Sequence, residues 1–139
     1  MSKGSGKSGS VQTAAGGRTP AKTADGITYS KGDRAVRNGD VAILVSVAKL
    51  DAAWRKDGTY HIPPGGGSDK GKYANAKAYV QNPTKGAVKM SEVHFDRKSG
   101  AVSISDGRHR AAAIRDLGKR TMWVTVSRSQ TASAKKALA

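Results

Sequence analysis

The segment Ile104-Ser-Asp-Gly-Arg-His-Arg110 joins the end of a predicted strand to the start of a predicted helix. Its Asp-Gly pair is a turn signal, and Gly107 has no Cβ that would keep an anion away from the backbone. The first N–H groups of a helix have no partner within the helix and lie at the positive end of its dipole. The next three residues, all Arg or His, add donor side chains to the same turn. This combination is typical of a phosphate-binding site.

We therefore expect the phosphate contacts to come from four consecutive residues, namely Gly107, Arg108, His109 and Arg110. Catalysis at this turn would use His109, whose ordinary pKa lies near neutrality, as a general base or as a donor to the leaving oxygen. The alternative is that a carboxylate-bound metal ion activates the water. The arginines would stabilise a phosphoryl transition state. The candidate catalytic residues are His109, Arg110 and Asp106.

Asp106 is expected at or near the N-cap of the helix, where its carboxylate accepts a backbone N–H. A purely structural interpretation of the same turn stays open. In it, Asp106 only caps the helix and Gly107 only permits the turn. The two arginines are then solvated or paired with Asp96 or Asp116.

Two carboxylates near this turn are candidate metal ligands. Glu92 opens one strand of a predicted hairpin and Asp106 closes the other. Mg²⁺ in phosphodiester chemistry takes two or three oxygen ligands, so Glu92 and Asp106 are the predicted pair. The alternative is that both charges are solvated, as charges at hairpin ends usually are.

Outward from the turn, the apolar pattern alternates between strand and helix. The predicted hairpin has Val93 and Phe95 on one strand, and its second strand is connected through Arg97-Lys-Ser-Gly100. Strands are predicted at 41–47, 92–96, 101–105 and 121–126, and helices at 49–56, 71–81 and 108–117. The expected fold class is α+β: a small mixed sheet with a β-hairpin and packed helices.

The predicted domain covers residues 41–127. Residues 1–40 contain eight Gly and few large apolar side chains, so we expect a flexible, basic, Gly/Ser-rich segment with at most a short edge strand around Ile27–Tyr29. Residues 128–139 are predicted to be a polar C-terminal tail, either a frayed helix or disordered.

Composition limits the class of protein. The 139 residues include no Cys, which excludes a disulfide framework, a Cys-ligated metal site and a cysteine nucleophile. No apolar run approaches the ~18 residues of a membrane span, and no apolar stretch follows the basic start, so we expect a cytoplasmic protein without a secretory signal or membrane partner. The net charge is +15, and most of the excess lies after residue 40, which predicts a polyanionic partner such as nucleic acid or nucleotide.

Asp106–Gly118 (DGRHRAAAIRDLG), with the strand Trp123–Val126 after it, resembles the ParB/sulfiredoxin-like superfamily, often labelled the ParB-like nuclease domain. The resemblance is closest over residues 90–127 and extends over 41–127. It implies a nucleotide or nucleic-acid phosphate at Gly107–Arg110, with ATP or CTP as the nucleotide. Sulfiredoxins carry a cysteine where this chain has Arg108, which excludes sulfinic-acid reduction.

The expected function is that of a ParB-like nuclease or nucleotide hydrolase acting on DNA or RNA. Two alternatives stay open: a non-catalytic nucleotide- or nucleic-acid-binding module of phage or plasmid type, and a small-molecule kinase as in some relatives. The basic Gly/Ser-rich head also fits a toxin delivered into a target cytoplasm. A toxin of that kind would have a cognate inhibitor protein as a partner.

Other residues carry weaker signals. His94 is expected to point away from the core, and His61 precedes a Pro-Pro-Gly-Gly-Gly loop. The loop is interpreted as a lid or linker rather than a second phosphate loop, because it lacks the P-loop pattern. Tyr73 and Tyr79 either stack on bases or belong to the core.

Overall fold

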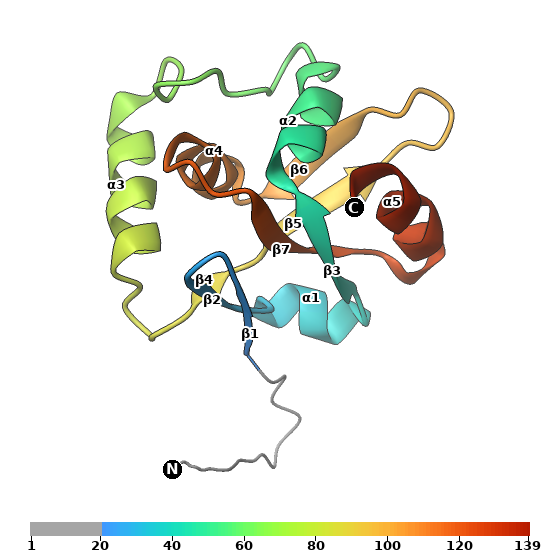
Figure 1. Ribbon diagram of the computed structural model, residues 1–139, viewed down its shortest axis with the longest axis horizontal. Coiled ribbons are helices and arrows are strands. Elements are labelled where there is room, and N and C mark those ends of the chain that lie inside the picture. Colours follow the sequence, from blue (N-terminus) through green and yellow to red (C-terminus); the bar gives the residue numbers. More distant parts are fainter. Residues whose placement is uncertain (1–20) are drawn as a thin grey trace.

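Helices and strands interleave along residues 21–139, the part of the chain that the computed structural model describes (Figure 1). The strands form two sheets, and the helices are five α-helices and one short 3₁₀ helix, so the predicted α+β class is confirmed. No helix within these residues combines the length and apolar character needed to cross a bilayer.

The larger sheet contains four strands in the order β3-β7-β5-β6. These are β3 (Val41–Ser46), β7 (Thr121–Val126), β5 (Ser91–Phe95) and β6 (Val102–Asp106). The two outer pairs are antiparallel and the central pair β7–β5 is parallel, which makes the sheet mixed. The β5–β6 pair is the predicted hairpin, and β6 ends directly at the turn where the candidate site begins.

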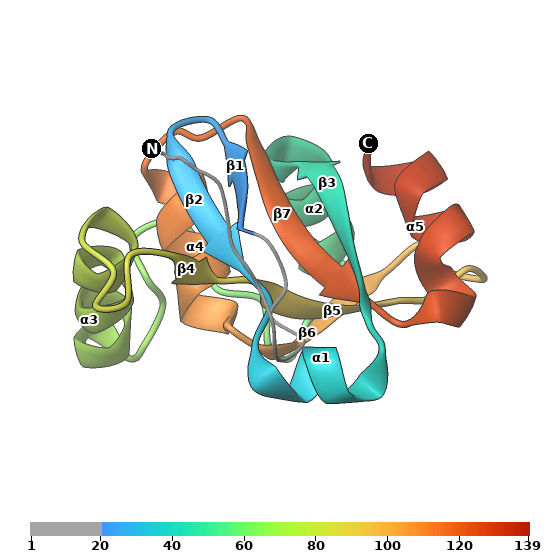
Figure 2. The ribbon, with the colours of Figure 1, turned by 90° about the horizontal axis from the view of Figure 1, so that it is seen from below.

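Four α-helices surround this sheet (Figures 1 and 2). They are α2 (Val47–Arg55), α3 (Lys70–Gln81), α4 (Arg108–Asp116) and α5 (Thr131–Leu138), with the 3₁₀ helix η2 (Arg128–Gln130) before the last. Helix α3 packs beside α4 at one end of the molecule, and α5 packs near β3 at the other. The core between them includes fully buried Ile43, Leu50, Trp54, Ile114 and Val124.

A second, smaller sheet contains β1 (Lys22–Ala24), β2 (Ile27–Ser30) and β4 (Val88–Lys89), followed after β2 by the short helix α1 (Asp33–Asn38). Strands β1 and β2 are antiparallel, and β2 pairs in parallel with β4. Because β4 leads straight into β5, this sheet lies close to the start of the hairpin.

The prediction that residues 1–40 are a flexible segment is wrong for residues 21–40, and its first 20 residues lie outside the described part. The short strand predicted around Ile27–Tyr29 is present as β2, although it lies in the middle of its sheet and not at an edge. Tyr29 and Ala35 are completely buried. Asp25 and Gly26 adopt positive φ angles of 50° and 81°, which closes the β1–β2 turn. The Asp25 carboxylate also accepts the backbone N–H of Arg120 at 2.6 Å. The few apolar residues of this stretch are therefore sufficient, because they pack against a core supplied by the rest of the chain.

The C-terminal segment is likewise part of the fold rather than a tail. Helix α5 buries Ala134 and Leu138, four residues apart on one face. Gln130 fixes its start, since its side-chain oxygen accepts the backbone N–H of Phe95 at 2.8 Å. The predicted domain, residues 41–127, is therefore too short at both ends.

Candidate phosphate-binding site

Helix α4 begins without a side-chain cap from the described residues. Its N-cap is Gly107, in the left-handed region with φ 87° and ψ 29°. In contrast, Ser46 accepts the Lys49 N–H at the start of α2 (3.2 Å), and Asp69 accepts the Lys72 N–H at the start of α3 (3.0 Å). The first N–H groups of α4 are thus available to an external acceptor at the positive end of the helix dipole.

Asp106 does not cap the helix, contrary to the sequence prediction. Since Gly107 occupies the N-cap, Asp106 lies one residue too early. Its carboxylate instead accepts from Arg110 Nη2 at 3.0 Å and pairs with Lys89 Nζ at 3.3 Å. Partial burial opposes ionisation of Asp106, but the hydrogen bond and charge of Arg110, with Lys89, outweigh it and lower its pKa.

The backbone at Gly107 is closely packed. Its carbonyl oxygen accepts from the hydroxyl of buried Ser91 at 2.9 Å. A Cβ at this position would lie 2.5 Å from Arg110 Nη2 and 2.6 Å from Ser91 Oγ. The glycine is therefore required both by its backbone conformation and by the space around it.

Gly107→Ala is expected to destabilise the protein by about 2 kcal/mol. The left-handed conformation costs an alanine roughly 1–2 kcal/mol, and the Arg110 and Ser91 side chains must also shift. Thermal unfolding followed by circular dichroism measures the loss. Gly118→Ala is the control, since Gly118 also has a positive φ (80°) but no atom lies within 4 Å of the point where its Cβ would be. Equal losses in the two variants would contradict the packing argument.

The two arginines of the turn have different surroundings. Arg110 is held by two partners, because its Nη2 donates to Asp106 and its Nε donates to the Lys89 carbonyl at 3.0 Å, and its side chain is only 17% exposed. Arg108 makes no ion pair within residues 21–139, and its guanidinium lies over the Tyr60 ring, 5.0 Å from the centroid. Arg108 is thus free to contact a ligand, whereas Arg110 joins the turn to β4.

His109 lies beside Arg108 in the same turn. Partial burial lowers its pKa below the ordinary value, and the charges of Arg108 and Lys72 add to this effect against the opposing charge of Asp69. The imidazole is therefore mainly neutral at pH 7. A neutral imidazole has a free nitrogen lone pair and is able to accept a proton.

Two cavities meet at this turn. One, of about 530 Å³, lies between α3 and the turn and is lined by Lys72, Tyr79 and Gly107–Arg110 among others. The other, of about 570 Å³, lies under the loop 59–69 and includes Tyr60. Both include Lys72, Arg108 and His109 in their walls. The start of α4 therefore faces two adjoining, cation-lined spaces of a size typical of ligand sites.

The predicted metal ligands, Glu92 and Asp106, lie opposite each other on β5 and β6 and line one cavity. Each is already neutralised, since Arg34 Nη2 lies 3.0 Å from Glu92 Oε1 and Asp106 binds Arg110 and Lys89. Within residues 21–139 no group of three or more His, Asp or Glu is placed to hold a metal ion together. The carboxylates do not form a ready-made Mg²⁺ site, and coordination by this pair stays a prediction.

Of the remaining histidines, His61 lines the cavity under the loop 59–69 together with Arg108 and His109, whereas His94 does not line either cavity at the turn. His94 is exposed on β5, as predicted, with its Nδ1 2.8 Å from the Gln130 amide nitrogen. His61 is largely buried, packs edge-on against Trp54 and lies 2.9 Å from Asp51 Oδ1.

The two tyrosines and the glycine loop are tied down by hydrogen bonds. Tyr73 donates to Asp116 at 2.8 Å, and Tyr79 accepts the Lys89 N–H at 3.1 Å while donating to the Ala87 carbonyl. Gly65 N–H also donates to Asp116, at 3.1 Å. The loop is therefore fixed to the C-terminal end of α4.

A buried ion network that the sequence does not predict joins α4 to α2. Asp51 Oδ1 accepts from Arg115 Nη1 at 2.9 Å and its Oδ2 from Arg55 at 3.1 Å. Arg115 also donates to Asp116 at 2.8 Å and to the Ile62 carbonyl at 2.6 Å. The only sequence signal was the Asp51–Arg55 spacing of four within a helix. This network joins α2, α4 and the loop that borders the candidate site.

The fold and site together define a small α+β domain in which a helix start opens onto cationic cavities. No protein-family model matches the chain, and no curated protein matches it in sequence. Among solved structures, it is similar to the oncogenic suppression activity protein, a plasmid fertility inhibition factor, in its gold(I) cyanide derivative. The two share 15% identity with a TM-score of 0.64, over 99% of this chain and 78% of the other. This likeness shows a shared fold.

Proposed function

We propose that this protein binds the phosphate groups of a nucleic acid or nucleotide at the start of α4 and hydrolyses a phosphate ester there. The observation that carries the proposal is the uncapped helix start at Gly107, which faces two adjoining cavities whose walls share Lys72, Arg108 and His109. Free N–H groups, a helix dipole and unpaired cationic side chains are together suited to a phosphate. The resemblance of Asp106–Gly118 to ParB/sulfiredoxin-like proteins supports the same ligand class.

In the proposed reaction, backbone N–H groups of the turn and Arg108 hold the non-bridging phosphate oxygens. His109 accepts a proton from a water molecule, and the water oxygen attacks the phosphorus. The ester P–O bond breaks, and the leaving oxygen takes up a proton from His109 or from solvent. The cationic donors stabilise the charge that develops on the phosphate oxygens. Arg110 positions the turn through Asp106 and the Lys89 carbonyl.

The rate of this reaction is expected to rise with pH through an apparent pKa below 6.5 and to be level near pH 7. The direction follows because only neutral His109 accepts the proton, and burial with the nearby Arg108 charge lowers its pKa. The measurement is kcat/KM for plasmid nicking and for ATP or CTP hydrolysis from pH 5 to 8, with and without Mg²⁺. His109→Gln is expected to remove the acid limb and lower the rate about 100-fold. An unchanged profile in this variant would rule out the proposed base.

A non-catalytic binding module is the second candidate, and the state of the carboxylates favours it. Glu92 and Asp106 are both engaged by cationic side chains, which leaves them unavailable to activate water without rearrangement. Ligand binding that depends on Arg108, with no cleavage or hydrolysis at any pH, would assign the protein to this class. The name of the structural neighbour, a plasmid fertility inhibition factor, is compatible with a plasmid setting for either candidate.

A further inference from the structure

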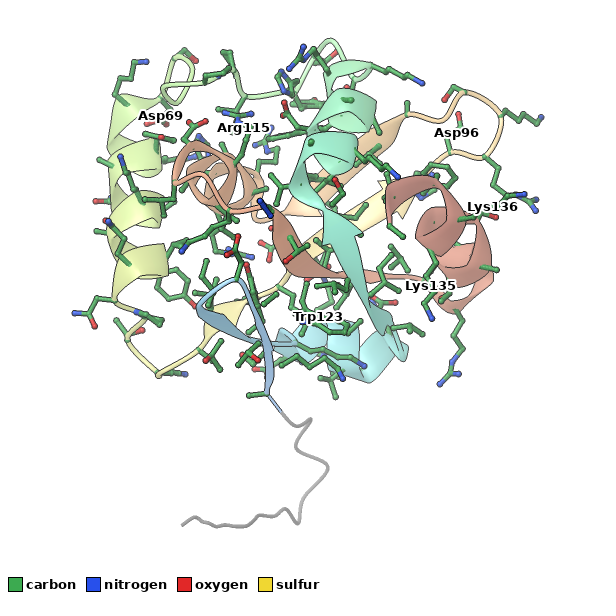
Figure 3. The ribbon with its side chains drawn as sticks, in the orientation of Figure 1. Asp69, Asp96, Arg115, Trp123, Lys135 and Lys136 are labelled. Atoms are coloured by element: carbon green, nitrogen blue, oxygen red, sulfur yellow. The ribbon has the colours of Figure 1, made fainter. Side chains whose placement is uncertain are left out.

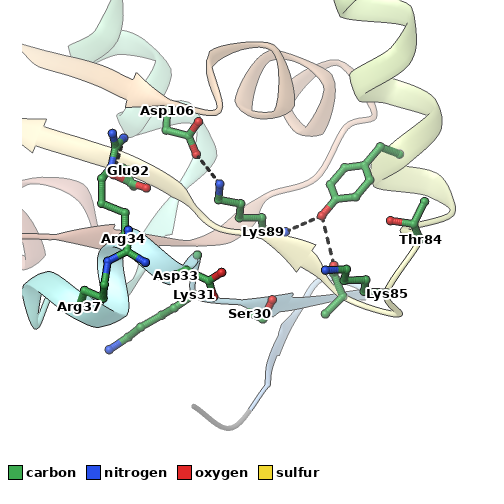
Figure 4. Close-up of a pocket in the computed structure, with 13 residues that line it drawn as sticks. Ser30, Lys31, Asp33, Arg34, Arg37, Thr84, Lys85, Lys89, Glu92 and Asp106 are labelled. Atoms are coloured by element: carbon green, nitrogen blue, oxygen red, sulfur yellow. Dashed lines mark hydrogen bonds and ion pairs between the residues drawn. The ribbon is translucent and has the colours of Figure 1, made fainter. Parts of the chain in front are cut away.

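A third cavity, of about 680 Å³, lies on the side of the turn formed by the segment 30–37 (Figure 4). Its walls come from β2 and α1, from the connection after α3, and from β4 to β6. Five cationic side chains line it, namely Lys31, Arg34, Arg37, Lys85 and Lys89, together with three carboxylates, Asp33, Glu92 and Asp106. Six of its thirteen lining residues belong to residues 1–40, the segment that the sequence predicts to be flexible.

The pairing inside this cavity leaves an excess of positive charge. Arg34 neutralises Glu92, and Lys89 contributes to neutralising Asp106. Within residues 21–139, Arg37 and Lys85 make no ion pair, and both are exposed to solvent. Lys31 donates only to the Asp40 carbonyl, at 2.7 Å. Three cations thus face the cavity against the single carboxylate of Asp33, an arrangement that attracts an anion.

The cavity adjoins the candidate site through shared wall residues. It shares Tyr79, Lys89 and Asp106 with the cavity between α3 and the turn, and that cavity shares Lys72, Arg108 and His109 with the one under the loop 59–69. The three spaces therefore follow one another, with the start of α4 in the middle. Each alone has a volume typical of a small-molecule site, so the row is longer than a mononucleotide requires.

The far end of the row carries an aromatic ring suited to a base. Tyr60 is 55% exposed, more than the other large hydrophobic side chains of the described residues. The Arg108 guanidinium lies over one face of the Tyr60 ring. Exposed aromatic rings beside a cationic groove are the usual platform on which single-stranded bases stack.

We infer that the ligand is a single polynucleotide strand rather than a free nucleotide, and that it runs through all three cavities with Arg37 and Lys85 contacting its backbone on one side of α4. This inference rests on the proposed function, because it extends the phosphate site at the start of α4 in both directions.

The test compares two double variants that each remove two exposed positive charges. Arg37→Ala with Lys85→Ala removes cations from the third cavity. Lys135→Ala with Lys136→Ala removes them from α5, at the other end of the molecule from α3 and α4 (Figure 3). None of the four side chains makes an ion pair within the described residues, so both variants are expected to unfold at the wild-type temperature.

Binding of a fluorescent dodecathymidylate and of ATP is measured at several salt concentrations. The cavity variant is expected to bind the oligonucleotide about tenfold more weakly than the wild type. The slope of log affinity against log salt concentration is expected to become shallower by about 1.4, because two phosphate contacts are lost. Its affinity for ATP is expected to equal that of the wild type. The α5 variant is expected to resemble the wild type with both ligands. Equal loss in the two variants would overturn the inference in favour of diffuse attraction. An equal loss of ATP and oligonucleotide in the cavity variant would overturn it too.

The proposed function is tested separately in the same assay. Arg108→Ala is expected to weaken both ligands, because both place a phosphate at α4. If Arg108→Ala binds both ligands normally, the phosphate site at α4 is refuted. The comparison of the two double variants does not depend on that result, so the two failures are distinguishable.

Discussion

Arg108→Ala is expected to weaken binding of ATP, CTP or a short oligonucleotide by about 10- to 100-fold. A hydrogen bond between a charged donor and a charged acceptor contributes about 1.5–3 kcal/mol to binding, and losing that free energy corresponds to this range of affinity. Arg108 is the arginine of the turn without an ion pair among the described residues, and its planar guanidinium can donate two parallel hydrogen bonds to a phosphate. Isothermal titration calorimetry measures the change directly.

Two controls make this result specific to the turn. Arg97→Ala removes the same side chain from the β5–β6 connection, at the opposite end of β6 from α4. It is expected to change binding by less than about threefold, through net charge alone. Arg108→Lys keeps the charge but loses the planar fork, so an intermediate affinity is expected. If Arg97→Ala and Arg108→Ala weaken binding equally, the protein attracts polyanions without a focused site.

Asp51→Ala is expected to destabilise the protein by about 3 kcal/mol, lowering the unfolding temperature by about 10 °C. The variant removes the shared partner of Arg115, Arg55 and His61. The Arg115 side chain is only 11% exposed, so it would keep a buried charge that Asp116 alone must balance. Breaking one partner of a buried ion pair is costly for this reason.

The measurement is thermal unfolding at pH 7, with Asp33→Ala as the control. Asp33 is exposed and makes no ion pair within residues 21–139, so its loss is expected to cost about 0.5 kcal/mol or less. Asp51→Ala is also expected to weaken nucleotide binding, because the network holds the Ile62 carbonyl and hence the loop that carries Tyr60. A loss below about 1 kcal/mol would show that the network contributes little.

Local sequence signals were sufficient for the elements nearest the site. The β5–β6 hairpin, α4 and the Gly118 that ends it agree with the sequence prediction. Their signals are alternating apolar residues, a short turn and a glycine after the last apolar residue, and each signal spans only a few positions. Strand β4 has two residues and no pattern of its own. Strands β1 and β2 lie in a Gly-rich stretch whose burial depends on the rest of the molecule.

The roles of individual residues at the turn depended on distant partners. Arg108 and Arg110 flank His109 in the sequence and look equivalent there. In the folded protein, the Arg110 side chain is held by hydrogen bonds, and that of Arg108 makes none among the described residues. Arg110 is fixed by the carbonyl of Lys89, which is 21 positions away. Lys89 also pairs with Asp106. The position of β4 therefore determines that Asp106 and Arg110 are engaged, whereas Arg108 stays accessible. The spacing of four between Asp106 and Arg110 is the one local signal for this arrangement, and the contacts of Lys89 have none.

The proposed site requires the backbone at the start of α4 to receive a phosphate. Amide chemical shifts recorded by ¹⁵N NMR during titration with ATP, and then with dodecathymidylate, test it most directly. The largest shifts are expected at the amides of Arg108, His109 and Arg110, with both ligands, because these N–H groups have no partner within the helix. Small shifts spread evenly over the basic surface, or shifts confined to another helix, would contradict the account.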